Sequence, residues 1–257
     1  DQQYMVFQNL NRFKRITNLD GVIKSKGWRV AKEICEYANN FSEELVTPEA
    51  LCQDKDGFVV ALGNMLAEYQ MLLNEGNLID FSTIQTECFR ILKENPAILE
   101  ELQEKIKYLM VDEYQDTNTA QFELIRLLAQ RNRNLCVVGD DDQSIYKFRG
   151  ANIRNILDFE KVYPDAEVIK LEQNYRSTQN ILDAANNVIH NNIGRKDKAL
   201  WTDRGSGNRI HFRPFDNAYD EAEYIASDIK SKKYQGTSDY GQCAVLYRTN
   251  AQSVSYT

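Results

Sequence analysis

The stretch LMVDEYQDTN, residues 109–118, joins a short apolar run to three carboxylates that follow it at once, Asp112, Glu113 and Asp116. The apolar residues 109–111 are bulky and unbroken, which is typical of a buried parallel β-strand covered on both faces. In sheets of parallel strands, ligands gather at the carboxyl ends of the strands. The sequence therefore predicts a ligand site where this strand ends.

The neighbouring acids Asp112 and Glu113 suit the chemistry of a magnesium nucleotide. One carboxylate can hold a hard cation with its water molecules, and the other can take a proton from an attacking water. A structural role is the alternative, because Asp116 or Thr117 is expected to cap a helix predicted over residues 119–130. Such a cap leaves the first two acids unexplained, so the stretch alone keeps both interpretations open.

Two further segments repeat the order of apolar run and polar loop. Residues 135–138 are apolar and precede GDDDQSIYKFRGA, residues 139–151, in which acidic and amide groups give way to aromatic and basic ones. A third strand is predicted over residues 168–171, ahead of EQNYRST and a helix over residues 178–190. Strand ends that lie side by side predict one shared site.

The first third of the chain shows helical periodicity instead. Two apolar stripes recur at helical spacing, formed by Ala31, Ile34, Cys35 and Ala38 and by Met65, Leu66, Tyr69, Leu72 and Leu73. Further helices are predicted over 81–92, 97–106 and 219–231, and further strands over 210–215 and 243–247. This order predicts an α/β protein with a helical unit ahead of the sheet.

Composition limits the classes of protein that fit. The 257 residues, 42% of them hydrophobic, can form a sizeable core and more than one domain. No run approaches the ~18 apolar residues of a membrane span, and no signal peptide is recognisable, so we expect a cytoplasmic protein that uses no membrane. The five scattered cysteines are interpreted as reduced core thiols, and two histidines without a CxxC motif argue against a zinc centre.

The net charge of −7 conflicts with a nucleic-acid-binding role, but its distribution is uneven. Residues 36–116 hold 17 acidic and 5 basic side chains, whereas residues 1–29 and residues 195–213 each hold 6 basic and 2 acidic ones. A local path for a polyanion on an acidic body is therefore possible, and solvated faces without a partner are the alternative.

Several segments together resemble one protein family. Five segments carry the resemblance: VDEYQDTN, VVGDDDQSIYKFRGA, LEQNYRST and, further on, RKDKALWT and AVLYRTNAQS. Over residues 80–257 the chain closely resembles the UvrD/PcrA/Rep group of superfamily 1 DNA helicases. The resemblance implies a RecA-like parallel-sheet P-loop NTPase fold with an α-helical insertion subdomain. It assigns residues 1–78 to that subdomain, 79–172 to the C-terminal part of the first motor domain and 173–257 to the start of the second.

One hallmark of such enzymes does not occur in the chain. The phosphate-binding pattern G-x-x-x-x-G-K-[ST] is absent, and no glycine is followed by lysine. The family carries this loop upstream of the helical insertion, and a distal arginine is expected beyond Thr257. We therefore expect an incomplete fold, an internal fragment of a helicase that is inactive by itself.

The resemblance implies roles for individual residues at the nucleotide. Asp112 is expected to help hold Mg²⁺ through water, and Glu113 to orient and deprotonate the water that attacks the γ-phosphate of ATP. Gln143 is expected to sense that phosphate, and Arg176 to contact it. Tyr175 is expected to stack on the base. The structural alternatives are a loop amide for Gln143 and core packing for Tyr175.

Other residues are expected to meet DNA. Tyr146 and Phe148 would stack on single-stranded bases, next to the basic Arg149. The family usually has tryptophan at the position of Phe148, so the stacking platform is smaller here. Arg248 and Asn250 match positions near the DNA backbone, although internal hydrogen bonding of that segment explains them equally well.

The implied function is an ATP-dependent and Mg²⁺-dependent DNA helicase that moves 3′ to 5′ on single-stranded DNA and unwinds duplexes at junctions. One alternative is a complete but degenerate module that binds DNA or a protein partner without hydrolysing ATP. Another is a metal-dependent nuclease built from Asp112, Glu113, Asp116 and residues 140–142. The nuclease is disfavoured because no lysine or histidine accompanies these carboxylates in the sequence.

Overall fold

The chain forms two compact units. The computed structural model describes residues 1–257 except 147–149, 193–194, 197 and 255–257. Unit 1 comprises Asp1–Leu171 and Ile189–Ala199, and unit 2 comprises Glu172–Val188 and Leu200–Thr257. The chain therefore leaves unit 1, returns to it for a short segment, and then continues in unit 2.

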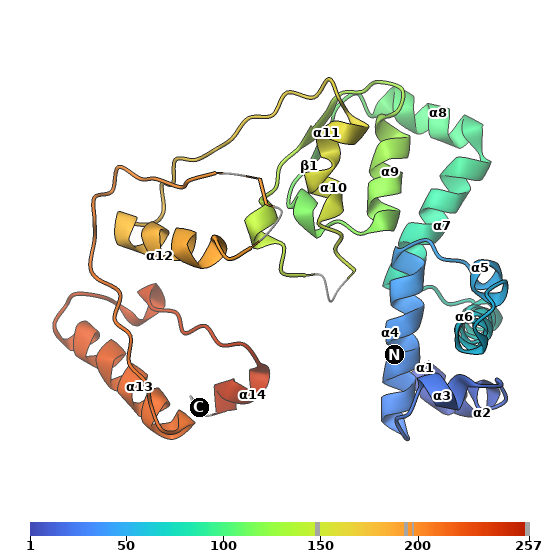
Figure 1. Ribbon diagram of the computed structural model, residues 1–257, viewed down its shortest axis with the longest axis horizontal. Helices are drawn as coiled ribbons and strands as arrows, with labels where there is room; N and C mark the ends of the chain where they lie inside the picture. The colour runs from blue at the N-terminus through green and yellow to red at the C-terminus, as the bar shows by residue number, and fades with distance from the viewer. Residues whose placement is uncertain (147–149, 193–194, 197, 255–257) are drawn as a thin grey trace. The chain divides into compact units, whose positions relative to one another are not determined.

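Unit 1 begins with a series of helices and continues into an α/β part, coloured from blue to yellow in Figure 1. Its elements are α1 (Gln2–Gln8), α2 (Leu10–Phe13), α3 (Leu19–Val22), α4 (Trp28–Glu43), α5 (Pro48–Cys52), α6 (Gly57–Glu75), α7 (Phe81–Glu94), α8 (Pro96–Lys105), β1 (Leu109–Val111), η1 (Tyr114–Asp116), α9 (Thr119–Ala129), β2 (Leu135–Val137), η2 (Asp141–Gln143), α10 (Arg154–Leu157) and α11 (Phe159–Val162).

The largest hydrophobic core lies among the N-terminal helices. Both predicted stripes are confirmed, because all four residues of the α4 stripe and all five of the α6 stripe are buried together with Val6 and Phe13. Burial of such side chains stabilises a fold by about 1.5–3 kcal/mol each. This part of unit 1 is held by ordinary apolar packing.

Polar contacts join that core to α7. Asp80 caps α7 by accepting a hydrogen bond from the backbone N–H of Thr83 at 2.7 Å, and it also accepts one from the buried hydroxyl of Tyr69 on α6. Gln2 on α1 donates to the same Tyr69 oxygen at 2.7 Å. Burial raises the pKa of Tyr69, and the neighbouring Asp80 adds to the shift. The start of α7 is thereby tied to α1 and α6.

The sheet is smaller and more open than the sequence predicts. β1 and β2 pair in parallel with Met110 opposite Cys136, and both of these residues are exposed, Met110 to 76%. The prediction of a strand covered on both faces is therefore wrong, since no described element packs over this face. The expected burial of all cysteines is also wrong, because Cys52, Cys88 and Cys136 are exposed and only Cys35 is buried.

The cap of α9 is Asn118, which follows the two predicted candidates Asp116 and Thr117. Asn118 accepts a hydrogen bond from the backbone N–H of Gln121 at 2.8 Å, and the Gln121 side chain accepts one from the backbone N–H of Asn118 at 3.2 Å. This reciprocal pair satisfies two backbone donors at the helix start. Asp116 and Thr117 therefore do not cap the helix, and the Asp116 carboxylate is not engaged in capping.

Unit 2 contains α12 (Gln179–Ile189, whose last residue belongs to unit 1), α13 (Ala218–Tyr234), η4 (Tyr240–Gln242) and α14 (Asn250–Ser253). The predicted helices over 178–190 and 219–231 are confirmed within a few residues. The predicted strands 168–171, 210–215 and 243–247 do not form in the described structure, where a single bridge joins Gln173 to Trp201. A strand needs a neighbour to receive its backbone hydrogen bonds, and apolar residues of these segments stay exposed, Leu246 to 94%.

Within the described residues, no helix is both long and apolar enough to cross a membrane.

Candidate functional site

The turn after β1 presents two exposed acids at the edge of the parallel pair. Glu113 adopts a left-handed backbone conformation with φ of 50°, which is uncommon for a residue with a side chain and costs of order 1 kcal/mol. Its backbone N–H donates to Oδ1 of Asp112 at 2.9 Å. The strained residue is the one to which the sequence assigns the proton transfer.

A third carboxylate of this turn, Asp116, is only partly satisfied. Its Oδ1 atom is buried and has no hydrogen-bond partner among the described residues. Burial raises the pKa of Asp116 and the nearby charge of Glu113 raises it further, while Gln115 offsets part of this shift. Asp116 and Glu113 line a hollow of about 440 Å³ together with Asp112 and residues of α9 that include Gln121. A hard cation fits this place, because Mg²⁺ is commonly held by one or two carboxylates, water and substrate phosphate.

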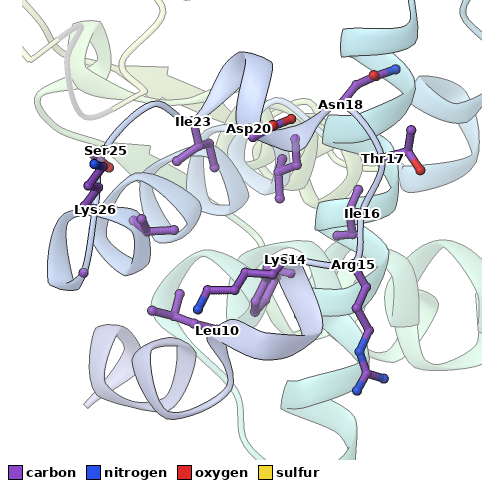
Figure 2. A pocket seen from close by; sticks show the side chains of 14 residues that line it. Leu10, Lys14, Arg15, Ile16, Thr17, Asn18, Asp20, Ile23, Ser25 and Lys26 are labelled. Atoms are coloured by element: carbon purple, nitrogen blue, oxygen red, sulfur yellow. The ribbon is translucent and has the colours of Figure 1, made fainter.

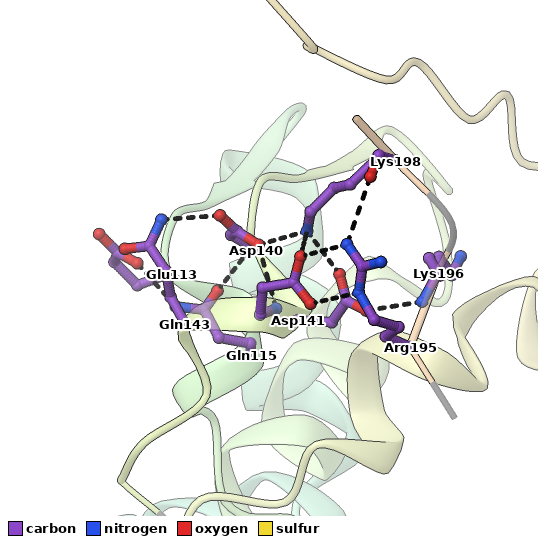
Figure 3. A network of polar contacts seen from close by, with 9 residues as sticks. Glu113, Gln115, Asp140, Asp141, Gln143, Arg195, Lys196 and Lys198 are labelled. Atoms are coloured by element: carbon purple, nitrogen blue, oxygen red, sulfur yellow. Dashed lines mark hydrogen bonds and ion pairs between the residues drawn. The ribbon is translucent and has the colours of Figure 1, made fainter. Parts of the chain in front are cut away.

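The loop after β2 lies against the same turn and is joined to it through a buried amide. Gln143 donates from Nε2 to Oδ2 of Asp140 at 2.7 Å. The backbone N–H of Asp140 donates to Oε1 of Gln115 at 2.9 Å, and Nε2 of Gln115 donates to Oε2 of Glu113 at 2.7 Å. Figure 3 shows this chain of hydrogen bonds from Glu113 to Gln143. Two of the predicted site residues are therefore brought together.

The acidic residues of this loop are neutralised from within unit 1. Arg195 donates to both oxygens of Asp142, from Nε and from an Nη atom, at 2.8 Å each. The Lys198 ammonium contacts Asp140 and lies 2.8 Å from Asp141 and 3.2 Å from Asp142. These five residues, Asp140, Asp141, Asp142, Arg195 and Lys198, are called the clamp below.

The clamp shifts the proton equilibria of its members. The hydrogen bond from Arg195 lowers the pKa of Asp142 most, and Lys198 lowers it further. Burial by itself would lower the pKa of Lys198, but hydrogen bonds to Asp140 and Asp141 outweigh it and the pKa is raised. Both shifts favour the charged forms, as close opposite charges do.

The contacts of the clamp also show which carboxylates already have a cationic partner. In the described part of the chain, only the carboxylates of residues 140–142 converge on one place, all within 4.8 Å of one another. The Lys198 ammonium already contacts all three of them. The expectation that no lysine accompanies these carboxylates is therefore wrong. That lysine is itself held in ion pairs with the three acids.

The predicted DNA-stacking loop follows η2. Tyr146 is 37% exposed, and its backbone carbonyl accepts a hydrogen bond from the N–H of Ala151 at 3.3 Å. Phe148 and Arg149 lie outside the described residues. The surface position of Tyr146 suits a stacking role, because a base needs access to the ring face.

The remaining predicted nucleotide residues lie in unit 2. Tyr175 is 75% exposed, and its hydroxyl donates to Oε1 of Gln173 at 2.8 Å. Arg176 is exposed as well, and its backbone N–H donates to Oδ1 of Asn174 at 2.9 Å. The Asn174 side chain thereby sets the turn that presents both residues. Packing of Tyr175 in a core, the structural alternative, does not occur in unit 2.

Arg248 and Asn250 belong to a small capped turn of unit 2 rather than to a strand end. The backbone N–H groups of Arg248 and Thr249 donate to Oε1 of Gln252 at 3.0 and 2.9 Å, and Asn250 begins α14. Hydrogen bonds within the turn therefore satisfy these backbone N–H groups. The Arg248 side chain is exposed, and its surroundings do not indicate one particular role.

A larger cavity of about 680 Å³ lies among the N-terminal helices, away from the strand ends (Figure 2). Its wall includes apolar Leu10, Phe13 and Ile23, and Lys14, Arg15 and Lys26 from the basic segment also line it. Three of the basic residues that the sequence analysis counted in this segment therefore gather around one hollow.

Three residues of the site were not found from the sequence. Gln115 lies inside the quoted motif, but a glutamine between acids carries no signal of burial. Arg195 and Lys198 belong to RKDKALWT, which contributed to the resemblance without a role. Their pairing partners are 53 to 58 positions away, so no local pattern reveals the contact.

Comparison with known proteins agrees with this geometry. A family profile described as the UvrD/REP helicase N-terminal domain matches residues 2–164, and one described as the UvrD-like helicase C-terminal domain matches residues 169–256. The chain belongs to the UvrD/REP helicase family. Such domains imply a RecA-like α/β fold, in agreement with the parallel pair and its helices.

Curated relatives extend the match over most of the chain. The ATP-dependent DNA helicase UvrD1 of Mycobacterium bovis is 46% identical over an alignment of 228 residues that covers 84% of this chain and 30% of that protein. The ATP-dependent DNA helicase PcrA of Bacillus subtilis is 41% identical over an alignment of 252 residues that covers 96% of this chain and 34% of that protein. The chain thus spans about a third of the length of these relatives. The resemblance inferred from the motifs is confirmed.

Proposed function

We propose that this chain is part of an ATP-dependent DNA helicase. The gene product that contains it would couple ATP hydrolysis to 3′ to 5′ movement along single-stranded DNA and to duplex unwinding at junctions, in the cytoplasm. The observation that carries the proposal is the hydrogen-bonded chain from Glu113 to Gln143 at the ends of two parallel strands, in a member of this family. The activity is proposed for the complete gene product, because these 257 residues hold no phosphate-binding loop.

Residues of the turn after β1 would carry the hydrolysis. Asp112 would hold Mg²⁺ through water, and Asp116, whose Oδ1 has no hydrogen-bond partner in the described part of the chain, lines the same hollow. Bound Mg²⁺ would neutralise charge that develops on the phosphates. Glu113 would orient the attacking water and accept its proton. Gln143 would contact the γ-phosphate and thereby couple its presence to the loop that carries Tyr146.

Residues of unit 2 would complete the nucleotide contacts. Tyr175 exposes the ring face that base stacking requires, and Arg176 carries a permanent charge suited to the γ-phosphate. We propose that residues 1–78 form the helical insertion, 79–172 the end of the first motor domain and 173–257 the start of the second. Tyr146, Phe148, Arg149, Arg248 and Asn250 are proposed as contacts to single-stranded DNA.

The complete gene product provides the test. We expect ATP hydrolysis that needs Mg²⁺ and rises with single-stranded DNA, together with unwinding of a duplex that carries a 3′ tail and not of one with a 5′ tail only. A product that binds the tailed DNA without hydrolysing ATP would instead be the degenerate binding module. Unwinding from the 5′ tail alone would keep the helicase and reject the direction.

A further inference from the structure

Gln115 is the most deeply buried polar residue between the two strand ends. Its residue exposure is 1%, and it lies in η1, one position after the buried Tyr114. Burying an amide costs free energy unless its polar atoms are hydrogen-bonded. Both functional atoms of this amide are satisfied, one by Glu113 and the other by the backbone of Asp140.

The surroundings of Gln115 leave room for this amide only because a glycine faces it. A Cβ atom placed on Gly139 would lie 2.7 Å from Oε1 of Gln115 and 2.8 Å from Cδ1 of Ile156. Such distances are below normal contact, so any other residue at position 139 would displace the amide. The loop after β2 can therefore approach close enough for the backbone N–H of Asp140 to reach Gln115.

The two hydrogen bonds of Gln115 act on different partners. Nε2 fixes Oε2 of Glu113 and leaves Oε1 of that carboxylate for another donor. Oε1 of Gln115 fixes Asp140, whose own carboxylate holds both Gln143 and Lys198. The loop after β2 and the Glu113 carboxylate are therefore linked through one buried side chain.

We propose that Gln115 is a positioning residue that orients the Glu113 carboxylate toward the attacking water and couples it to the loop carrying Gln143. The catalytic part of this inference rests on the proposed function. Gln115 does not touch the nucleotide and transfers no proton. Its effect is geometric, because a carboxylate held at one oxygen keeps the other in place for the water.

Two substitutions separate the two hydrogen bonds in the complete gene product. Gln115→Met keeps the size and removes both bonds. Gln115→Glu keeps an acceptor for the N–H of Asp140 but places a carboxylate against Glu113. We expect kcat for ATP to fall roughly 10- to 100-fold in both, the usual worth of an orienting partner, while KM changes less than about threefold.

Hydrogen exchange provides a measurement that is independent of activity. In Gln115→Met the backbone N–H of Asp140 loses its acceptor, so exchange of the segment 139–143 should become about 5- to 10-fold faster. In Gln115→Glu it should stay close to that of the wild type. Gln103→Met is the matched control, since Gln103 is 6% exposed and bonds the Leu127 carbonyl away from the site. It should leave both kcat and this exchange unchanged.

A double substitution distinguishes positioning from general support of the fold. If Gln115 acts through Glu113, then adding Gln115→Met to Glu113→Gln should lower kcat little further, whereas a merely structural role would give additive losses. Wild-type kcat in both Gln115 variants, or additive losses, would overturn the inference while leaving the helicase intact. A wild-type product without ATPase activity would contradict the proposed function instead, and the Asp140 exchange would still show whether Gln115 holds the loop.

Discussion

Similar acidic residues follow β1 and β2, but the two groups have opposite electrostatic surroundings. After β1, Asp112 and Glu113 are exposed, and a buried oxygen of Asp116 has no hydrogen-bond partner among the described residues. After β2, the acids of residues 140–142 are met by the two cations of the clamp. The residue types are nearly the same, but among the described residues ion pairs with lysine and arginine form only in the second group.

This difference gives the acids after β2 a structural role and leaves the acids after β1 as those that we propose for chemistry. A buried charge needs a partner, and a partner supplied by the protein leaves less for a ligand. Carboxylates held without such a partner mark places where a cation or a reacting group can bind. Counting acids in the sequence does not separate the two cases, whereas the position of Lys198 does.

The largest effect should come from a matched pair of acid-to-amide changes in the complete gene product. Glu113→Gln should reduce ATP hydrolysis by about 10²- to 10⁴-fold with nucleotide binding retained, because the general base is lost. Asp141→Asn in the clamp should leave kcat within about threefold. Steady-state kinetics with nucleotide titrations would measure both. Equal losses from the two changes would break the distinction between the strand ends.

Removing the lysine of the clamp should chiefly affect stability. Lys198→Met leaves three acids without their shared cation, and we expect a loss of about 2 kcal/mol in the free energy of unfolding, less than for a fully buried pair because these groups are partly exposed. Lys196→Met, which breaks an outer pair with Glu160, should cost at most about 1 kcal/mol. Urea denaturation of the 257-residue chain would compare them. A smaller loss for Lys198 than for Lys196 would contradict the clamp.

The loop beyond the clamp should matter for DNA rather than for stability. Tyr146→Ala in the complete gene product should weaken binding of single-stranded DNA by roughly 1–3 kcal/mol if a base stacks on the ring. The dependence of binding on salt should stay nearly constant, since no phosphate contact is removed. Titration of a labelled oligonucleotide at several salt concentrations would show this. Wild-type affinity would make Tyr146 a packing residue.

The smallest expected effect is a pH dependence of the clamp. The folded pKa of Asp142 lies below its ordinary value of 3.8, so its stabilising contribution is complete above that value and is lost as the pH falls through the folded pKa. At pH 7, Asp142→Asn should cost about 1 kcal/mol, and the difference from the wild type should shrink below pH 3.8. Denaturation midpoints at several pH values would measure it. A difference that grew in acid would reverse the sign and reject the ion pair.

Local patterns predicted the helices well, whereas of the five predicted strands only those at 109–111 and 135–138 form in the described structure, as β1 and β2. The stripes of α4 and α6 were correct because helical periodicity needs only neighbours within the same segment. Three segments have the composition of strands without forming them, namely 168–171, 210–215 and 243–247. A strand forms only beside a neighbouring strand that receives its backbone hydrogen bonds. The cap of α9 was predicted at Asp116 or Thr117, one or two residues early, because several adjacent side chains can serve as a cap and only the folded helix start shows that Asn118 does.

The sequence by itself determined the family and the position of the candidate site, because both depend on contiguous motifs such as VDEYQDTN. The tertiary structure decided which of the acids are neutralised and that Gln115 joins the two strand ends. Those contacts link residues that are 25 to 58 positions apart. Charge and hydrogen-bonding capacity are written in the sequence, but neutralisation depends on distance, and only the folded path of the chain sets that distance.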